Sequence, residues 1–319
     1  MSPYILFIAR RLAVLVLILL MTSFGAFLLL FLSPGSPETV LLGDRPASPA
    51  VVSAIRAKYN LDDPFVVQYA KWLKGAVKLD FGRSIRTSEQ VTSAIGNRLG
   101  LTIGLAIMAF SFTMVLGITL GTIVALNSRT ALDRGVVGLS VLASSAPAFA
   151  SGILLLYLFA VQLRWFPAFG NGSGLLDRMW HLVLPAIALS LPPTALVLKM
   201  TRAAMVRELE RDYVAFALSR GVSRARVIYA YVLRNALVPV VTAAGLIIGA
   251  LLTGAVLVEV TFSLAGIGSL LVESVLFHDI PVVQGLVMLF ATIIVLANLA
   301  ADVTYLLIDP RIRFAKGKK

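Results

Sequence analysis

Few residues of this chain have types and spacings that could do chemistry. The two histidines, His181 and His278, have no partner residues at the spacing of a metal site. Gly266 and Gly268 form only a G-x-G pair, and neither a G-x-x-x-x-G-K-[ST] phosphate loop nor a nucleophile-elbow pattern occurs. The sequence therefore predicts no catalytic residue, no metal site and no cofactor bound by this polypeptide.

The remaining polar residues of interest lie within or beside long apolar runs. Ionisable groups inside lipid cost about 2.5 to 3.5 kcal/mol on insertion scales, and the runs nearly avoid them. Glu259 and Asp302 bound two of the runs, and each fits either an inexpensive interfacial position or a gate or intersubunit contact. Weakly polar side chains could line a path for solutes of variable structure; the candidates are Ser140, Ser144, Ser145, Thr242 and Thr253.

The composition makes lipid the main solvent of the chain. Apolar residues make up 59% of it and charged residues only 14%, with a mean hydropathy of +0.92, whereas a soluble domain carries about a quarter charged residues. The net charge of +12 would suggest a nucleic-acid partner in a soluble protein. Here the cations flank apolar runs, so membrane topology and lipid head groups explain them better.

Six uncharged runs meet or approach the length of about 20 residues that a spanning helix needs. They are Leu12 to Leu32, Leu99 to Ser128, Gly135 to Leu163, Met179 to Leu198, Asn235 to Val258 and Ile280 to Ala301. The fourth run is the least typical because it contains His181 and three prolines. The runs do not alternate polar and apolar residues, so they predict an all-α membrane protein with six transmembrane helices rather than a barrel.

The distribution of Lys and Arg predicts the orientation. With the amino terminus in the cytosol, 17 of the 28 cations lie inside, and the short outer loops carry only Arg164 and Arg178. The first run is too long for a signal peptide and lacks a small-residue cleavage site, so we expect an uncleaved span. An even number of spans then places both termini in the cytosol.

These patterns divide the chain into four parts. Residues 1–32 are a cytosolic stub and the first span, 33–98 an external helical segment, 99–308 the transmembrane core and 309–319 a basic cytosolic tail. In the external segment, Ser48-Pro49 and Asp63-Pro64 predict two capped helices, and the second of them, Phe65 to Lys78, carries Tyr69 and Trp72. This segment either caps the span ends or forms a platform for a soluble partner.

A basic stretch of mixed polarity from Lys199 to Arg234 separates two apolar runs. Apolar residues recur at helical spacing at Met205, Leu209, Tyr213, Phe216 and Ala217. We expect Gly221 to end this helix, Ser223 to cap the next one, and Pro239 to begin the following span. The pair, at about 202–235, could lie on anionic lipid or dock in a partner's groove; a DNA-binding role is disfavoured because spans tether both ends.

Within this stretch, Ala215 to Gly221 resembles the EAA loop of the membrane subunits of binding-protein-dependent ABC importers. Ala215 stands where the founding pattern has Glu. The resemblance covers nearly the whole chain, and the order and spacing of its motifs make it specific. The other matching segments are Pro34 to Pro37 (with Ser36 for Asp), Tyr59 to Pro64, Gln68-Tyr69, Trp72, Phe81 to Ser84, Leu233 to Pro239, Glu259 to Gly268 (with Ala265 for Pro), Asp279 to Gly285, and Asp302 through Asp309 to Arg313.

The resemblance implies a type I ABC importer permease, of the "B" type found in dipeptide and oligopeptide systems of the bacterial inner membrane. It implies a second, related permease, two ATPase subunits that bind ATP and Mg and engage the EAA loop, and an external binding protein that delivers peptides. The residues that it assigns to ATPase coupling are Tyr213, Ala215, Phe216, Ala217, Gly221, Arg234, Asn235 and Pro239. Dipeptide, oligopeptide, glutathione, haem and nickel chelate all remain open as cargo.

Two other classes of function compete with this interpretation. A self-contained secondary transporter or channel would favour internal repeats and charged residues within the membrane. The sequence shows no internal repeat and almost no charged residue within its apolar runs. A membrane scaffold would only anchor a soluble complex. Uptake by the chain alone, driven by an ion gradient, distinguishes the first of these from an ATP-driven permease.

Overall fold

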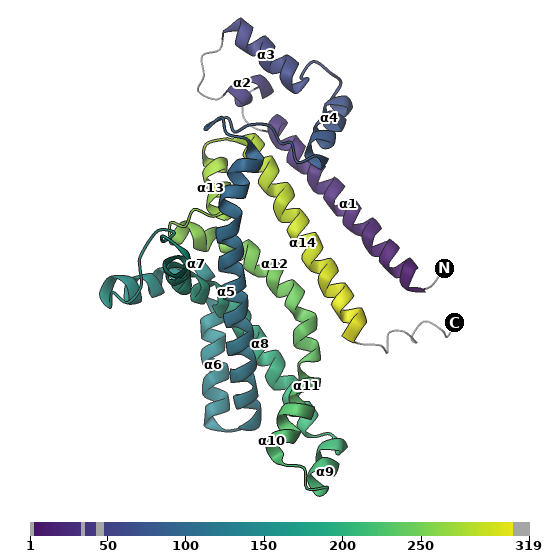
Figure 1. Ribbon diagram of the computed structural model, residues 1–319, viewed down its shortest axis with the longest axis vertical. Coiled ribbons are helices and arrows are strands. Elements are labelled where there is room, and N and C mark those ends of the chain that lie inside the picture. The colour runs from purple at the N-terminus through teal and green to yellow at the C-terminus, as the bar shows by residue number, and fades with distance from the viewer. Residues whose placement is uncertain (1–2, 33–35, 43–47, 309–319) are drawn as a thin grey trace. The chain divides into compact units, whose positions relative to one another are not determined.

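The computed structural model describes residues 3–32, 36–42 and 48–308, and its regular structure there is helical, apart from an isolated β-bridge between Arg83 and Gln90 (Figure 1). Five of the described helices are long and apolar enough to cross a membrane, and a bent pair of helices is a sixth candidate. The all-α class is thereby confirmed, and the predicted number of six spans is reached only if the bent pair is counted as one span. Residues Pro34 and Gly35 of the predicted motif and the basic tail 309–319 lie outside the described residues.

The chain forms two compact units. The first consists of residues up to Thr102 together with Ala265–Leu296, and the second of Ile103–Leu264 together with the residues from Ala297 onward. Two long helices, α5 (Val91–Leu126) and α14 (Ile280–Ile308), contribute to both units.

Among the described residues, the first unit contains four helices before α5. They are α1 (Pro3–Leu32), α2 (Pro37–Leu42), α3 (Pro49–Tyr59) and α4 (Phe65–Val77), and α13 (Ile267–Leu276) joins them from later in the chain. The helix α2 was not predicted. Aliphatic side chains of α5, α13 and α14 form one of its cores, including Val91, Ile267 and Leu286.

The two predicted helix caps of this segment have different outcomes. Ser48 caps α3 as predicted, because its hydroxyl accepts a hydrogen bond from the Val51 amide. The prediction for Asp63 is wrong: Pro64 is the N-cap residue of α4, and no side chain caps that helix. The Asp63 carboxylate instead accepts a hydrogen bond at 2.5 Å from Nζ of Lys71, the seventh residue of α4.

The second unit contains α6 (Ala131–Ser145), α7 (Ala148–Leu155), the π-helix η1 (Leu156–Gln162) and α8 (Leu175–Leu209). The third predicted span, Gly135 to Leu163, is not one straight helix. Its two halves meet at 103° at Ala146 and Pro147. Ala146 has an extended backbone with ψ of 139°, the conformation that a following proline favours, so the helix breaks there.

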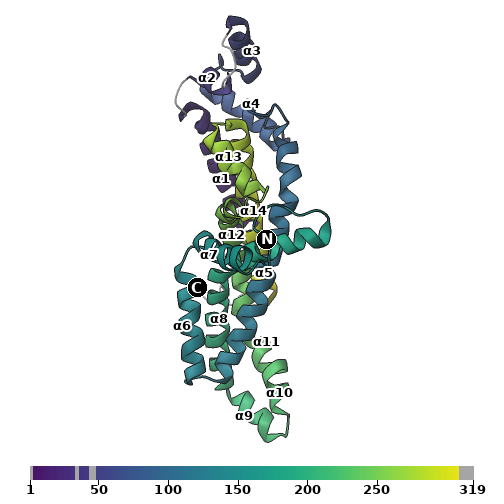
Figure 2. The same ribbon diagram turned by 90° about the vertical axis from the view of Figure 1, so that its left-hand side faces the viewer.

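The helix α8 contains the fourth predicted span and runs through Pro185, Pro192 and Pro193 without a break. It packs against α6, and α5 approaches it closely at two glycines (Figures 1 and 2). A Cβ atom at Gly117 would lie 2.6 Å from Val197 Cβ, and one at Gly121 would lie 2.7 Å from Thr201 Cβ. Only glycine therefore permits this helix–helix contact, as small residues do in membrane bundles.

Candidate coupling surface and path residues

A small core holds together the helices that follow α8. These are α9 (Asp212–Ser219), α10 (Arg224–Arg226), the π-helix η2 (Val227–Val232), α11 (Leu233–Ala236) and α12 (Val238–Thr261). The buried side chains of this core are Ala125, Ala204, Met205, Val214, Val227, Ile228, Val232 and Ala236. Because the end of α5 contributes Ala125, the α9 region is fixed to the end of a long spanning helix as well as to α8.

The predicted helix from Met205 to Ala217 is interrupted. The helix α8 ends at Leu209, Arg211 has an extended backbone with ψ of 144°, and α9 begins at Asp212. The break allows Val214 of α9 to enter the same core as Met205 of α8. Asp212 lies in the first turn of the new helix, where a carboxylate interacts favourably with the helix dipole.

The prediction for the Gly221 backbone is confirmed. Gly221 has φ of +79°, its amide donates to the Leu218 carbonyl at 3.0 Å, and the Val222 amide donates to the Ala217 carbonyl at 3.1 Å. This pair of bonds is a Schellman motif, in which glycine adopts the left-handed conformation. Val222 and Ala217 also pack against the same core. The turn therefore sets the direction in which the chain leaves α9.

The predicted coupling residues of α9 lie on two faces. Tyr213 and Ala217 pack against the core, whereas Ala215 is exposed and the Phe216 side chain is 59% exposed. The Arg220 guanidinium lies 4.7 Å from the centre of the Phe216 ring. An exposed phenylalanine beside an arginine is a typical protein-docking feature.

Tyr213 connects α9 to its neighbours through hydrogen bonds. Its hydroxyl donates to Glu208 Oε2 of α8 at 2.8 Å and accepts from Asn235 Nδ2 of α11 at 3.4 Å. Burial raises the pKa of the Tyr213 hydroxyl, and the neighbouring Glu208 acts in the same direction. The hydroxyl thus stays protonated and available as a donor around neutral pH.

The remaining predicted coupling residues lie on α11 and at the start of α12. Arg234 and Asn235 are exposed on α11, and Pro239 lies in the first turn of α12, where proline starts a helix without losing a bond. Ser223 precedes α10, but its side chain makes no capping bond. The π-helix η2 joins α10 to α11, and such segments are frequent at functional sites.

An ion pair between α6 and α8 was not predicted from the sequence. Arg202 donates from Nε to Asp133 Oδ1 and from Nη2 to Asp133 Oδ2, both at 2.6 Å. Asp133, only 3% exposed, also accepts the Arg129 amide at 2.8 Å. The two residues are 69 positions apart, so no local pattern could pair them. The sequence shows only an Asp three residues after Thr130, and its burial is known from the structure alone.

The candidate path hydroxyls are bonded to their own helices. Ser144 and Ser145 both donate to the Val141 carbonyl, at 2.9 and 2.8 Å, and they end α6 directly before the 103° bend. Thr242 and Thr253 of α12 donate to carbonyls four residues earlier, at 2.9 and 3.0 Å. Ser140 makes the same kind of bond, to Val137 at 2.7 Å. These hydroxyls can still accept a hydrogen bond, since only the donor is used.

The candidate gate residues and the histidines have distinct surroundings. Glu259, near the end of α12, is 0% exposed. Asp302 lies in α14, but its side chain is outside the described part of the structure. His181 Nδ1 lies 2.8 Å from the Asp177 carbonyl oxygen, and His278 is an exposed turn residue with φ of +55°. Among the described residues, no group of three or more His, Asp or Glu side chains could hold a metal ion.

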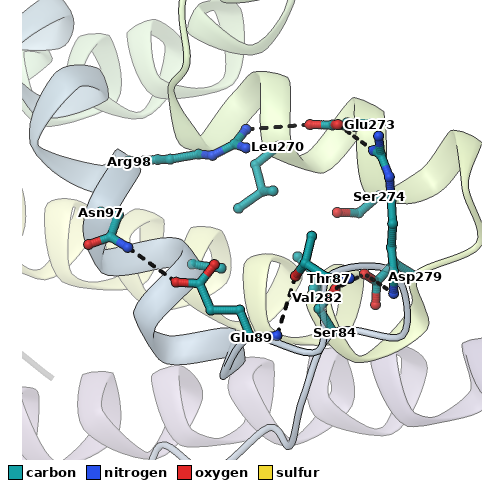
Figure 3. Close-up of a pocket in the computed structure, with 12 residues that line it drawn as sticks. Ser84, Thr87, Glu89, Asn97, Arg98, Leu270, Glu273, Ser274, Asp279 and Val282 are labelled. Carbon is teal, nitrogen blue, oxygen red and sulfur yellow. Dashed lines mark hydrogen bonds and ion pairs between the residues drawn. The ribbon is translucent and has the colours of Figure 1, made fainter.

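The first unit contains a cavity of about 130 Å³ between the 84–89 loop, α5 and α13 (Figure 3). Glu273 of α13 pairs with Arg86 and, at 3.5 Å, with Arg98. Asp279 accepts hydrogen bonds from Ser84 Oγ at 2.5 Å and from the Ile85 amide at 3.0 Å. The cavity is smaller than typical ligand sites of roughly 300 to 1,000 Å³. Its paired charges therefore attach the loop to α13 and α14 rather than form a peptide site.

Comparison with known proteins identifies the family. The "Binding-protein-dependent transport system inner membrane component" family matches residues 117–314, and the N-terminal family of the same components matches residues 4–106. The di/tripeptide transport system permease protein DppB of Pseudomonas aeruginosa is 37% identical over 334 residues, and the dipeptide transport system permease protein DppB of Alkalihalophilus pseudofirmus is 34% identical over 328; each alignment covers 96% of this chain and 98% of the relative.

A solved structure gives independent support for the fold. A chain of the MetNI methionine ABC transporter, in an inward-facing conformation, has a TM-score of 0.58 at 14% identity, over 68% of this chain and 97% of that one. The all-α permease fold is therefore confirmed. Family membership makes this a multi-pass bacterial inner-membrane protein and implies partner ATPases and a substrate-binding protein. The chain belongs to the family of inner membrane components of binding-protein-dependent ABC transport systems.

Proposed function

We propose that this chain is one of two permease subunits of an ATP-driven importer for di- or oligopeptides. The peptide cargo is inferred from relatives that are named di/tripeptide and dipeptide permeases and align over 96% of this chain. A second, related permease would form the other half of the path, two ATPase subunits would bind and hydrolyse ATP, and an external protein would deliver the peptide.

The observation that carries the coupling part of the proposal is the exposed side of α9. Phe216 is 59% exposed on a helix whose other side is packed into a core with α5 and α8. Because α9 is held by this core and presents an exposed aromatic side chain, it could bind in a groove on an ATPase subunit. In this scheme Ala215, Phe216 and Arg220 contact the ATPase. Tyr213, Ala217, Gly221, Asn235 and Pro239 hold the surface in position, and Arg234 lies at its edge.

The mechanism proposed is alternating access. Closure of the ATPases on ATP moves α9, and the core that α9 shares with α5 and α8 passes this displacement to the spanning helices. The path then opens outward to receive the peptide, and hydrolysis resets it inward. Ser144, Ser145, Thr242 and Thr253 would offer weak acceptors to the moving peptide, while Glu259 and Asp302 would act at the ends of the path.

The topology belonging to this proposal places both chain termini and α9 in the cytosol. It rests on the excess of Lys and Arg in the 199–234 stretch and in the terminal segments. Those cations lie on the side where the ATPases and ATP are found.

The decisive experiment is reconstitution of the chain in liposomes with its partner permease, the ATPases and the binding protein. We expect uptake of a labelled dipeptide that requires ATP and the binding protein. ATP-dependent uptake that rejects peptides would overturn the cargo assignment but keep the permease. Uptake by this chain alone under an ion gradient would instead support a self-contained transporter.

A further inference from the structure

We propose that α4 lies within the membrane, in the leaflet at the Leu32 end of α1, with phospholipid acyl chains covering one of its two apolar faces. This leaflet is called the distal leaflet below. The sequence had suggested an external helix that either caps a span or receives a soluble partner. The proposal does not depend on the cargo or on the coupling mechanism.

One face of α4 is packed against α1. Tyr69 and Trp72 lie 5.5 and 5.7 Å from the ring of Phe27, and Phe65 lies 5.4 Å from the same ring. Gln68 and Ala76 are buried on this side of the helix. The contact is therefore extensive, and it fixes α4 beside the distal half of α1 (Figure 1).

Hydrogen bonds set the depth of this contact. The Tyr69 hydroxyl and Ser23 Oγ are 2.7 Å apart, and Ser23 precedes Leu32 by nine residues, or about 14 Å of helix. Gln284 accepts from Trp72 Nε1 at 3.1 Å and donates to the Ala26 carbonyl at 3.1 Å. Ala26 lies about 9 Å along the helix from Leu32, by the same rise per residue.

These depths fall inside the hydrocarbon. The apolar span of α1 runs from Arg10 to Leu32, which matches a hydrocarbon layer about 30 Å thick. Side chains of α4 that bond to α1 at Ser23 and near Ala26 therefore reach well below the membrane surface. A helix held at that level is next to lipid unless other protein covers it.

The second face of α4 is apolar and exposed. Val66 and Val77 are 75% and 77% exposed, and exposed Ala70 and half-buried Leu73 lie between them. The four positions follow the i, i+4, i+7, i+11 pattern of one helix face. We call this face the Val66–Val77 stripe. A stripe of this length without polar residues is unusual on a water-facing surface.

The cations beside the stripe favour lipid as its occupant. Lys74 and Lys78 are exposed, and within the described residues neither forms an ion pair. Long lysine side chains at this depth can extend toward phosphate groups while their methylene stems stay in the apolar layer. Lys71, by contrast, is paired with Asp63 at 2.5 Å. Docking surfaces for soluble proteins typically combine an apolar centre with a polar rim that supplies hydrogen bonds. The Val66–Val77 stripe itself contains no polar side chain, which favours lipid over a soluble partner.

The absence of cysteine from the chain makes a direct test simple. Single variants Val66→Cys and Val77→Cys are labelled with a bimane fluorophore, assembled with the partner subunits and placed in nanodiscs containing lipids brominated on their acyl chains. Met21→Cys, at an exposed position of the α1 span, is the lipid-facing control. Ala57→Cys, exposed on α3 beside Arg56, is the water-facing control.

We expect brominated lipid to remove most of the fluorescence at positions 66, 77 and 21 and to leave position 57 unchanged, with aqueous iodide giving the opposite pattern. Quenching of positions 66 and 77 by iodide, but not by brominated lipid, would overturn the proposal in favour of an aqueous face. Protection of both positions from both quenchers would overturn it in favour of a protein partner. Two sites are used so that one failed variant leaves the test intact.

Discussion

At the scale of the residue, the turn after α9 rests on a backbone conformation that few residues can adopt. Gly221 has φ of +79°, yet a Cβ atom added there would meet nothing within 4 Å. The cost of substitution is therefore conformational, about 1 to 2 kcal/mol for a residue with a Cβ in the left-handed region. Asparagine tolerates this region better than β-branched residues do.

We predict that Gly221→Val distorts the turn, lowers peptide uptake severalfold and leaves ATP hydrolysis by the partner subunits running. Gly221→Asn, the matched control, should retain most of the uptake. The measurement is the ratio of peptide transported to ATP hydrolysed in proteoliposomes. Normal uptake by the valine variant, at normal expression, would contradict a coupling role for this turn.

The Asp133–Arg202 pair leads to a second prediction at this scale. Asp133 accepts three hydrogen bonds, from two Arg202 nitrogens and the Arg129 amide, and lies in the first turn of α6. Removing one partner of a buried pair costs about 3 to 5 kcal/mol, and less here because Arg202 is one-third exposed. Arg202→Ala leaves the buried Asp133 carboxylate without its cation, whereas Asp133→Ala leaves a guanidinium that can turn to water, so Arg202→Ala should lower the thermal unfolding midpoint more.

Arg202→Lys tests whether geometry matters as well as charge. Lysine keeps the charge but cannot make the two-point contact that Arg202 makes. We expect its midpoint to fall between those of the wild type and Arg202→Ala, as measured by thermal unfolding in detergent. An Asp133→Ala variant as stable as the wild type would show that the pair is replaceable.

At the scale of the element, the packing of α5 on α8 depends on missing side chains. A Cβ atom at Gly121 would lie 2.7 Å from Thr201 Cβ and 2.8 Å from the Leu198 carbonyl oxygen. The second of these is backbone, so it cannot rotate away. Overpacking of this kind costs typically about 1 to 3 kcal/mol.

We predict that Gly121→Ala separates the two helices and lowers the thermal unfolding midpoint. Gly135→Ala on α6 is the control, because a Cβ atom there meets nothing within 4 Å and helix propensity improves. Monodispersity on size-exclusion chromatography after heating provides the readout. Equal behaviour of the two variants would mean that α5 shifts without cost.

The contact between the short helices α2 and α3 should depend on pH. A hydrogen bond from the Arg56 guanidinium at 2.5 Å lowers the pKa of the Glu38 carboxyl below its usual range. A lowered pKa in the folded state stabilises the contact at pH values above the ordinary Glu value, and this contribution is lost as the pH falls through the lowered pKa.

We therefore expect amide hydrogen exchange in α2 and α3 to accelerate, relative to the intrinsic rate, when the pH falls from neutral to below 4. Glu38→Gln should already show the faster exchange at neutral pH and little further change. The effect should be small and sensitive to salt, because Arg56 is about half exposed. Identical pH profiles for the two proteins would exclude the ion pair as the cause.

At the scale of the whole molecule, the orientation in the membrane decides whether the coupling surface can meet the ATPases. The native chain has no cysteine, so single cysteines report sidedness without a background signal. Ser219→Cys on α9 and Ala57→Cys on α3 are both at exposed positions. We predict that a membrane-impermeant maleimide labels position 57 in right-side-out vesicles and position 219 only in inverted ones. The reverse pattern would remove the basis of the proposed function.

The sequence alone determined the class of molecule and its local chemistry. A helix satisfies its own backbone hydrogen bonds in lipid, so the apolar helices could be predicted from the long uncharged runs of the sequence. The Ser48 cap and the Gly221 turn depend on neighbours within six residues, and both were predicted correctly. The coupling residues followed from a resemblance over nearly the whole chain, and their roles stay predictions.

Only the tertiary structure decided features that join distant segments. The bend of 103° in the third span, the pairing of Asp133 with Arg202 and the contact between Tyr69 and Ser23 have no signature in local sequence. The break between α8 and α9 is another such feature, because it allows Val214 to pack in the same core as Met205. Hydrophobic periodicity records which residues avoid water, but in a membrane chain nearly every residue does, so packing partners are chosen by shape and by the few polar groups that must be bonded.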